Sequence, residues 1–144
     1  MSYESVPMSS AEIDEFLAET RHAVMGTNRI DGSPQLSPVW YLYRDGKFHT
    51  SVYGKSAKYC NLGRDHRVTL CVDGVYPDAR YVAIYGTVEF VEEESPWRDE
   101  IEKALAHCYH ESSEEAERYL RETKVPGAIM LVVTPHKVFG RNYN

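Results

Sequence analysis

The sequence lacks the features that mark several large classes of protein. It has no apolar run near 18 residues, so no segment is long enough to form a membrane-spanning helix. Its three cysteines, Cys60, Cys71 and Cys108, include no Cys-x-x-Cys pair, which argues against a disulfide framework and against a zinc knuckle. The first residues lack the charged-then-apolar pattern of a secretory signal. We therefore expect a cytoplasmic protein with no membrane partner.

An excess of positive charge is also missing. The chain has 144 residues with 16 Lys and Arg against 22 Asp and Glu, a net charge of −6, whereas nucleic-acid binding usually needs a basic face. Residues 44–67 depart from this balance, because six basic and two acidic residues give the segment +4 and leave −10 for the rest. The charge pattern therefore predicts a small anionic ligand and no nucleic-acid partner. A solvated loop surface is the alternative reading of the same segment.

Residues with known catalytic chemistry form no recognisable motif. No Gly-x-Ser-x-Gly stretch or paired acid–base motif is present, so the sequence shows no nucleophile for hydrolysis and we assign no catalytic residue. His107 and His110 have the spacing of one helix face, with Cys108 between them. Two histidines without a carboxylate or a third ligand make an incomplete metal site, so we predict no bound metal.

The chain reads as one domain, residues 1–144, because no repeat or linker divides it. A capping box at Ser9–Glu12 predicts a first helix, and a short second helix is expected from Ser56 to about Gly63. A helical pair should begin at Ser95-Pro96 and at about Ser113. The residues expected on the inner faces of this pair are Trp97, Ile101, Leu105, Cys108, Ala116, Tyr119 and Leu120.

Alternating apolar residues predict six strands. Their ranges are 22–27, 35–43, 47–52, 67–72, 81–92 and 128–133, with a polar tail after Pro135. Asp31-Gly32 and Asp45-Gly46 are hairpin signals between the first three strands. Consecutive hairpins do not fit a doubly wound parallel sheet, so we expect a mainly β (α+β) fold, a six-stranded antiparallel split β-barrel with peripheral helices.

The segment from Thr50 to Lys58 is the most informative for function. Thr50 and Ser51 end a predicted strand, and Lys55, Ser56 and Lys58 gather at the start of a helix. Free N–H groups and the positive dipole end of a helix suit a phosphate, which lysine and hydroxyl side chains also bind. The pattern is not a Walker loop. An exposed loop with solubilising lysines remains the alternative.

The segment 33–40 is unusual for a central strand. Pro34 and Pro38 cannot donate to a β ladder, so this strand should border a ligand or a sheet edge. Gln35 and Ser37 share one parity and could both direct polar groups at one planar ligand. Trp40 is expected in the core.

Three stretches, in this order, resemble the pyridoxamine-phosphate-oxidase-like split-barrel family and, within it, the small flavin- or deazaflavin-dependent oxidoreductases. They are Asp31-Gly-Ser-Pro-Gln-Leu-Ser-Pro-Val-Trp-Tyr, Ser56-Ala-Lys-Tyr-Cys-Asn-Leu-Gly-Arg-Asp-His-Arg-Val and Tyr81-Val-Ala-Ile-Tyr-Gly-Thr-Val-Glu. The resemblance covers nearly the whole chain. The second stretch is the most specific, because Lys-x-x-Asn-Leu-x-x-Asp-x-Arg-Val recurs as a unit in that family.

The resemblance implies a homodimer with two cofactor sites at the subunit interface. It places the cofactor phosphate against Ser56, Lys58 and the end of the strand at Thr50 and Ser51, with the ring system beside residues 35–39. The residues expected to bind cofactor are Gln35, Ser37, Pro38, Val39, Thr50, Ser51, Lys55, Ser56, Lys58 and Asn61. Family members often carry Arg where this chain has Cys60 and Gly63, so two positive charges are missing.

The implied function is an oxidoreductase that transfers hydride from reduced coenzyme F-420, a deazaflavin, or electrons from FMN to a small organic acceptor. The alternative is a non-catalytic FMN- or deazaflavin-binding or carrier protein. The deazaflavin is the expected cofactor, because its carboxylate tail needs a positive exit and residues 44–67 offer one. The cofactor carries the chemistry in such proteins, which agrees with the absence of a catalytic motif.

Overall fold

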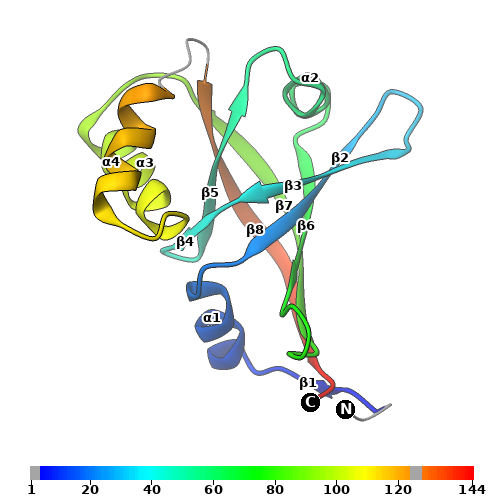
Figure 1. Cartoon of the computed structure of the whole chain (residues 1–144). Coiled ribbons are helices and arrows are strands. Elements are labelled where there is room, and N and C mark those ends of the chain that lie inside the picture. Colours follow the sequence, from blue (N-terminus) through cyan, green and yellow to red (C-terminus); the bar gives the residue numbers. More distant parts are fainter. Residues whose placement is uncertain (1–3, 124–127) are drawn as a thin grey trace.

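The computed structural model describes residues 4–123 and 128–144, and these residues form one curled antiparallel sheet with four helices outside it (Figure 1). The strands are β1 Val6–Pro7, β2 His22–Asn28, β3 Pro34–Trp40, β4 Leu42–Arg44, β5 Lys47–Tyr53, β6 Arg67–Asp73, β7 Arg80–Val91 and β8 Ala128–Asn142. The helices are α1 Ser10–Ala18, α2 Ala57–Arg64, α3 Pro96–Cys108 and α4 Ser113–Glu122. Within those ranges, no helix combines the length and the apolar character needed to cross a membrane.

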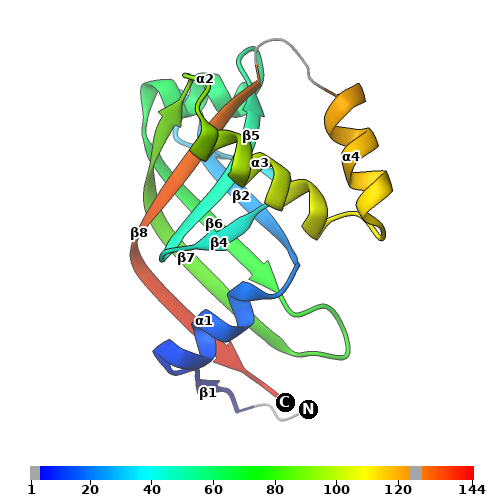
Figure 2. The same ribbon diagram turned by 90° about the vertical axis from the view of Figure 1, so that its left-hand side faces the viewer.

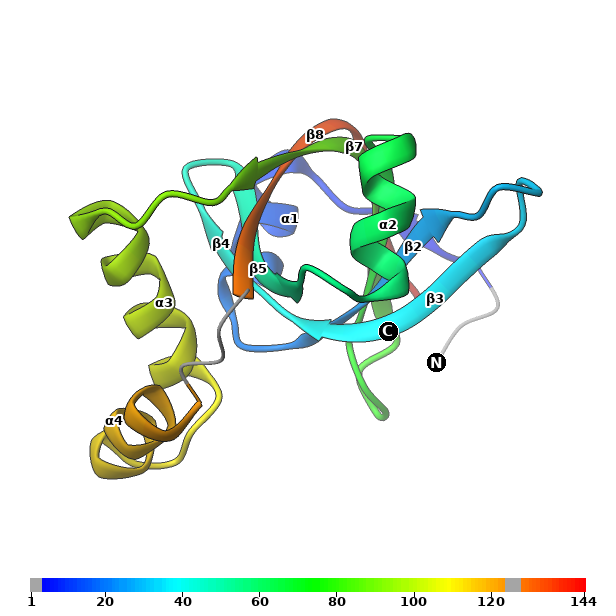
Figure 3. The same ribbon diagram turned by 90° about the horizontal axis from the view of Figure 1, so that it is seen from above.

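The order of the strands explains the shape of the sheet. Hydrogen-bonded neighbours run β3-β2-β6-β7-β8-β5-β4, and β1 pairs with β8. Only Tyr41 separates β3 from β4 in the chain, although they lie at opposite ends of this order. The chain itself therefore joins the two ends of the sheet and curls it into a barrel (Figure 3).

The barrel is split on one side. The strand β4 pairs with only three residues of β5, Lys47–His49. Among the described residues, the outer edges of Thr50–Tyr53 in β5 and of β3 therefore have no ladder partner. The edge position of β3 agrees with its two prolines, which a central strand would not tolerate. This structure confirms the split-barrel fold expected from the sequence.

Two helices close the ends of the barrel. The N-cap Ser9 of α1 forms the predicted capping box with Glu12. Phe16 of α1 is 1% exposed and lies against the guanidinium groups of Arg21 and Arg80, whose Cζ atoms are 3.9 and 5.0 Å from the ring centre. Helix α2 crosses the opposite end and buries Leu62 completely (Figure 3).

The strands differ from the six predicted ones in three main ways, apart from shifts of one residue at several ends. The run 35–43 breaks at Tyr41, because the chain there leaves β2 and takes β5 as its partner. The strand β8 continues through Pro135 to Asn142, since a register shift between Tyr85 and Gly86 accommodates the missing N–H of proline. The two-residue strand β1 pairs with the end of this extension.

Helices α3 and α4 pack on each other beside the barrel, as the predicted helical pair (Figure 2). The expected inner face of α3 is partly wrong, because Trp97 is 46% exposed and Cys108 is also exposed. Arg98 is buried instead. Its Nε donates to Glu102 Oε1 at 2.9 Å, and its terminal nitrogens donate at 2.8 Å to the carbonyls of Glu92 and Ala128. These acceptors compensate the buried charge and allow this face to turn inward.

The expected inner face of α4 is only partly buried. Ala116 is fully buried, Leu120 is half-buried and Tyr119 is 36% exposed. The last two residues lie at the edge of the helical pair that faces the split in the barrel, where they line a cleft.

The register shift at Gly86 gives a first prediction. A Cβ atom at this residue would lie 2.3 Å from the carbonyl oxygen of Thr134, which belongs to the backbone of β8. We expect Gly86→Ala to lower the free energy of unfolding by about 2–3 kcal/mol, as measured by denaturant titration. Gly63→Ala is the matched control, because open space surrounds Gly63 in α2, and it should leave stability unchanged or raise it by up to about 1 kcal/mol. Equal losses in both variants would contradict this view of the bulge.

Candidate cofactor site

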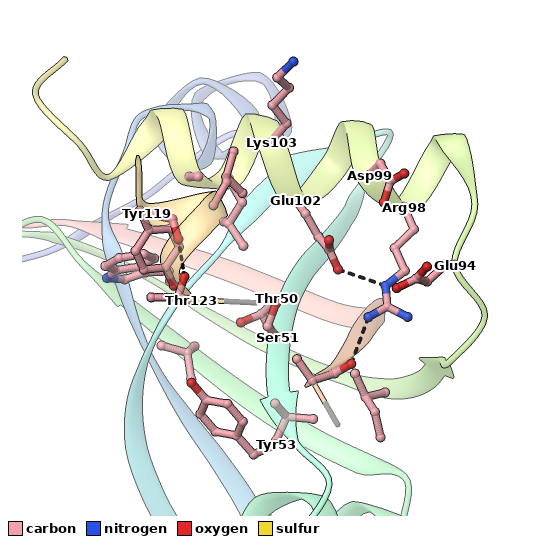
Figure 4. A pocket seen from close by; sticks show the side chains of 18 of the residues that line it. Thr50, Ser51, Tyr53, Glu94, Arg98, Asp99, Glu102, Lys103, Tyr119 and Thr123 are labelled. Carbon is pink, nitrogen blue, oxygen red and sulfur yellow. Dashed lines mark hydrogen bonds and ion pairs between the residues drawn. The ribbon is translucent and has the colours of Figure 1, made fainter. Parts of the chain in front are cut away.

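The split in the barrel opens into a cleft of about 980 Å³ (Figure 4). One side of the cleft is formed by β3, β5 and the start of β8, and the opposite side by α3 and α4. This volume is near the upper end of the range of small-molecule sites, about 300–1,000 Å³. The cleft therefore has room for a cofactor together with a second small molecule.

Two hydroxyl groups of the strands beside the cleft have no hydrogen-bond partner among the described residues, and one of them lines the cleft. Thr50 lines the cleft, is only 4% exposed and makes no side-chain hydrogen bond with any described residue. The Oγ atom of Ser37, on the neighbouring edge strand, is buried and likewise has no partner in the described structure. Buried polar atoms are nearly always hydrogen-bonded, which makes Ser37 Oγ an exception, although Ser37 does not line the cleft. The Thr50 hydroxyl is in contact with the open cleft and is available to a polar ligand there.

Lys58 adds a positive charge to the same region. It lines the cleft from the first turn of α2 and is half-buried, and this burial lowers the pKa of its ammonium group below the ordinary value for lysine. No carboxylate of the described residues lies within ion-pair distance of it. A desolvated cation without a counter-ion is suited to an anionic group such as phosphate.

The start of α2 fixes the position of Lys58. Ser56 is the N-cap, and its Oγ accepts a hydrogen bond from the backbone N–H of Tyr59 at 3.2 Å and donates to the carbonyl of Tyr53 at 2.8 Å. The hydroxyl of Ser56 is thus already engaged. Lys55 lies in the preceding loop, is exposed and does not line the cleft.

Asn61 and Gln35 belong to a hydrogen-bond chain that ties α2 to β2 and β3. Asn61 is 5% exposed, accepts from the Arg64 guanidinium through Oδ1 and donates from Nδ2 to Thr27 Oγ1 at 3.1 Å. The Thr27 hydroxyl donates in turn to Gln35 Oε1 at 3.3 Å. No sequence motif marks the part that Thr27 plays, because Thr27 is on β2 whereas its partners are on α2 and β3.

The ten expected cofactor-binding residues thus divide into two groups. Those that line the cleft are Pro38, Val39, Thr50, Ser51 and Lys58. Those that do not line it are Gln35, Ser37, Lys55, Ser56 and Asn61. Several members of the second group hold α2 and β3 in position, through the α2 cap or through the hydrogen-bond chain.

Sequence reasoning missed the helical side of the cleft. Trp40, expected in the core, is half-buried there, and its ring stacks on that of Tyr109 with 4.7 Å between centroids and 5° between planes. The residues of the helical pair that line the cleft include Arg98, Glu102, Leu105, Ala106 and Tyr119. No motif marks these residues, since only the docking of the helical pair brings them to the split.

The two ends of the cleft differ in charge. Lys55, Lys58 and Arg64 lie in or next to α2, and none of the three has an ion pair with the described residues. The side toward α3 carries carboxylates. Residues 92–122 contain eleven acidic and four basic residues, a net charge of −7, whereas the net charge of the whole chain is −6. An anionic ligand group is therefore favoured at α2 and disfavoured along α3.

The two helical histidines bind different partners. The Nε2 atom of His107 lies 3.3 Å from Glu117 Oε1, and the Nδ1 group of His110 donates to the carbonyl of Ala106 at 2.6 Å. In the part of the chain that the structure describes, no group of three or more His, Cys, Asp and Glu side chains is placed to hold a metal ion.

Comparison with known families decides the relationship. The model of the pyridoxamine 5′-phosphate oxidase family matches residues 9–142, which is almost the entire chain. The chain belongs to the pyridoxamine 5′-phosphate oxidase family. The resemblance of the motifs in 31–41, 56–68 and 81–89 is thereby confirmed. No curated protein matches the chain by sequence.

Solved structures share the fold. A conserved hypothetical protein of Mycobacterium tuberculosis is 25% identical with a TM-score of 0.81, over 100% of this chain and 91% of that one. A FAD-binding protein of Mesorhizobium loti is 17% identical with a TM-score of 0.77, over 97% and 99% of the two chains. An F420 reductase is 21% identical with a TM-score of 0.62, over 87% and 94%.

The different positions of Lys58 and Lys55 give a second prediction. Lys58→Ala should weaken binding of a phosphate-bearing flavin by roughly ten- to a hundredfold, the loss expected for a charge-assisted hydrogen bond of about 1.5–3 kcal/mol. Lys55→Ala, the matched control in the exposed loop, should change affinity much less. Fluorescence titration of the two variants and the parent measures both effects. Equal affinity of Lys58→Ala and the parent would refute the placement.

The pH dependence of binding supplies an independent readout. Because burial lowers the pKa of Lys58, its charge is lost at a lower pH than that of an exposed lysine as the pH rises. Affinity for a phosphate-bearing flavin should therefore fall with rising alkalinity in the parent. Lys58→Arg, which stays protonated, should remove this fall.

Proposed function

We propose that this protein is an oxidoreductase that uses a flavin-type cofactor to reduce a small organic acceptor. The observation that carries the proposal is the convergence in one cleft of Thr50, a buried residue with an unpartnered hydroxyl, and Lys58, a half-buried cation without an ion pair among the described residues. Structural neighbours described as a FAD-binding protein and an F420 reductase support a flavin-type cofactor.

The residues of the cleft would divide the work of binding. Thr50, Ser51 and Lys58 would hold the phosphate, and Pro38 with Val39 would contact the ring along the free edge of β3. The apolar part of the helical side would exclude water from the ring. A bound flavin or deazaflavin supplies the hydride or electrons, so no side chain of the chain has to act as an acid or a base.

The deazaflavin coenzyme F-420 is the cofactor that we propose, with FMN as the alternative. Both carry the same ribityl phosphate, so Lys58 does not choose between them. The deazaflavin continues into a tail with several carboxylates, and the unpaired cations Lys55 and Arg64 at α2 offer this tail a positive exit. The carboxylates along α3 would repel the tail if it extended toward α3. Of the six cations in residues 44–67, however, only Lys58 lines the cleft itself.

Titration with both cofactors is the third prediction and tests the function directly. The protein should bind coenzyme F-420 more tightly than FMN at low salt, and the difference should shrink at high salt because exposed charges are screened over about 10 Å at 0.1 M. FMN binding as tight as that of the deazaflavin, without greater salt sensitivity for the latter, would reverse the choice. Oxidation of the bound reduced cofactor by an added quinone separates an enzyme from a carrier.

A homodimer is proposed from the outer face of the sheet. Cross-strand partners form a continuous exposed row from Pro38 through Val24, Cys71 and Ala83 to Phe139. Val24 is 44% and Phe139 36% exposed, whereas Ala83 is half-buried, and such apolar exposure is unusual in a row that crosses five strands. Pro38 at one end of the row also lines the cleft, so a second subunit on this face would reach the cofactor site.

The mass in solution is the fourth prediction. Light scattering of the parent should give about twice the 16.5 kDa of one chain, since twofold dimers are the commonest oligomers. Phe139→Glu should shift the protein toward the monomer by placing a charge in the row. Trp97→Glu is the matched control, because Trp97 is equally aromatic and exposed but lies on α3. A parent of monomer mass at micromolar concentration would defeat the proposal.

A further inference from the structure

Glu102 is a carboxylate of the cleft with one oxygen still free. It extends from α3 toward β5, on the side of Ser51 (Figure 4). Its Oε1 accepts the hydrogen bond from Arg98 Nε at 2.9 Å, whereas Oε2 makes no hydrogen bond with the described residues. The side chain is only 31% exposed, so it is partly shielded from solvent. A ligand next to it would meet a hydrogen-bond acceptor with a negative charge.

The surroundings of Glu102 add to this charge. Glu94 and Asp99 line the same side of the cleft, and the ammonium group of Lys103 points away from it (Figure 4). The guanidinium of Arg98 donates four hydrogen bonds, to Glu102 and to three backbone carbonyls, and its charge is paired with Glu102. Lys103 has no ion pair with the described residues, but its ammonium group is turned away, so the carboxylates outnumber the cations that face this part of the cleft.

The remaining lining of this end is apolar. Leu105, Ala106 and Leu120 of the helical pair lie opposite Ile129 of β8, and the ring of Tyr119 borders them. Flat apolar molecules fit such a lining, since burial contributes about 25 cal/mol per Å² of apolar surface. Thr50, a residue only 4% exposed, lines the same cleft and makes no side-chain hydrogen bond with the described residues, so a ligand is expected in the cleft as a whole.

We propose that the α3 side is the acceptor's half of the cleft, and that Glu102 makes it selective for a flat apolar molecule with a cationic or hydrogen-bond-donating group. An anionic acceptor is disfavoured, because it would lose hydration beside carboxylates that outnumber the cations turned toward the cleft. The name acceptor rests on the proposed function, whereas the charge selection follows from the cleft itself. Glu102 is thus a specificity-determining residue.

Binding of three naphthalene compounds tests the selection and is the fifth prediction. The compounds 1-naphthylmethylamine, 1-naphthylmethanol and 1-naphthoate share one ring and differ in charge. Calorimetric titration at low salt should show the amine binding about tenfold more tightly than the naphthoate, the effect of about 1.4 kcal/mol from one partly shielded charge pair. Naphthoate binding as tight as that of the amine, or no binding of any of the three, would overturn the proposal.

Two variants assign the effect to Glu102. Glu102→Gln keeps the size of the side chain and an oxygen for Arg98, and should bring the affinities for amine and naphthoate within about threefold of each other. Glu100→Gln is the matched control on α3, because Glu100 does not line the cleft and has only an exposed ion pair with Arg44 at 3.5 Å. It should keep the parent's ratio. An unchanged ratio in Glu102→Gln would refute the assignment.

The design separates this proposal from the proposed function. None of the three compounds is turned over, and each is titrated with and without FMN. A protein that binds neither flavin but still prefers the amine overturns the proposed function and supports the charge selection. A protein that binds flavin but binds the amine and the naphthoate equally well supports the proposed function and overturns the charge selection.

Discussion

The change of partner at Tyr41 is the constraint on which the rest of the fold depends. Before this residue the chain bonds to β2, and after it the chain bonds to β5, at the other end of the sheet. Tyr41 is held at this junction, since its N–H donates to the Tyr109 hydroxyl at 3.0 Å and its own hydroxyl donates to the carbonyl of Leu17 at 3.2 Å. Burial raises the pKa of that hydroxyl, which therefore stays a donor. The barrel closes here and is split between β3 and the part of β5 beyond its short pairing with β4, so the cleft is a consequence of one junction.

Arg98 fixes the position of the helical pair on the barrel, as Tyr41 fixes the junction of the sheet. A buried guanidinium without acceptors would be costly, but Glu102 and three backbone carbonyls supply them. These carbonyls belong to the end of β7 and the start of β8, so one side chain ties α3 to the strands beside the split. The same contacts use one oxygen of Glu102 and leave the other in the cleft. Packing and the charge of the site are therefore set by the same residue pair.

Local signals in the sequence predicted most of the elements and the family. The capping residues Ser9, Ser56 and Ser95 start helices where expected, and the hairpin turns and the edge character of β3 are also correct. The errors arose where a distant contact overrides a local rule. Pro135 reads as the end of a strand, but a bulge opposite Gly86 accepts it. Arg98 is absent from the inner face expected for α3, and its burial depends on carbonyls at the end of β7 and the start of β8. The α3 side of the cleft was missed for the same reason, because it exists only once the helices dock.

The hydrogen-bond chain from Arg64 through Asn61 and Thr27 to Gln35 has a consequence for binding. It joins α2, which carries Lys58, to β3, which carries Pro38 and Val39. Neither element can shift without breaking a bond in which a buried donor or acceptor would be left unsatisfied. The distance between Lys58 on α2 and Pro38 and Val39 on β3 is thus set when the protein folds. A rigid ring system that matches this distance binds without the entropic cost of ordering the protein. One of a different length binds less well, because α2 and β3 cannot move to fit it.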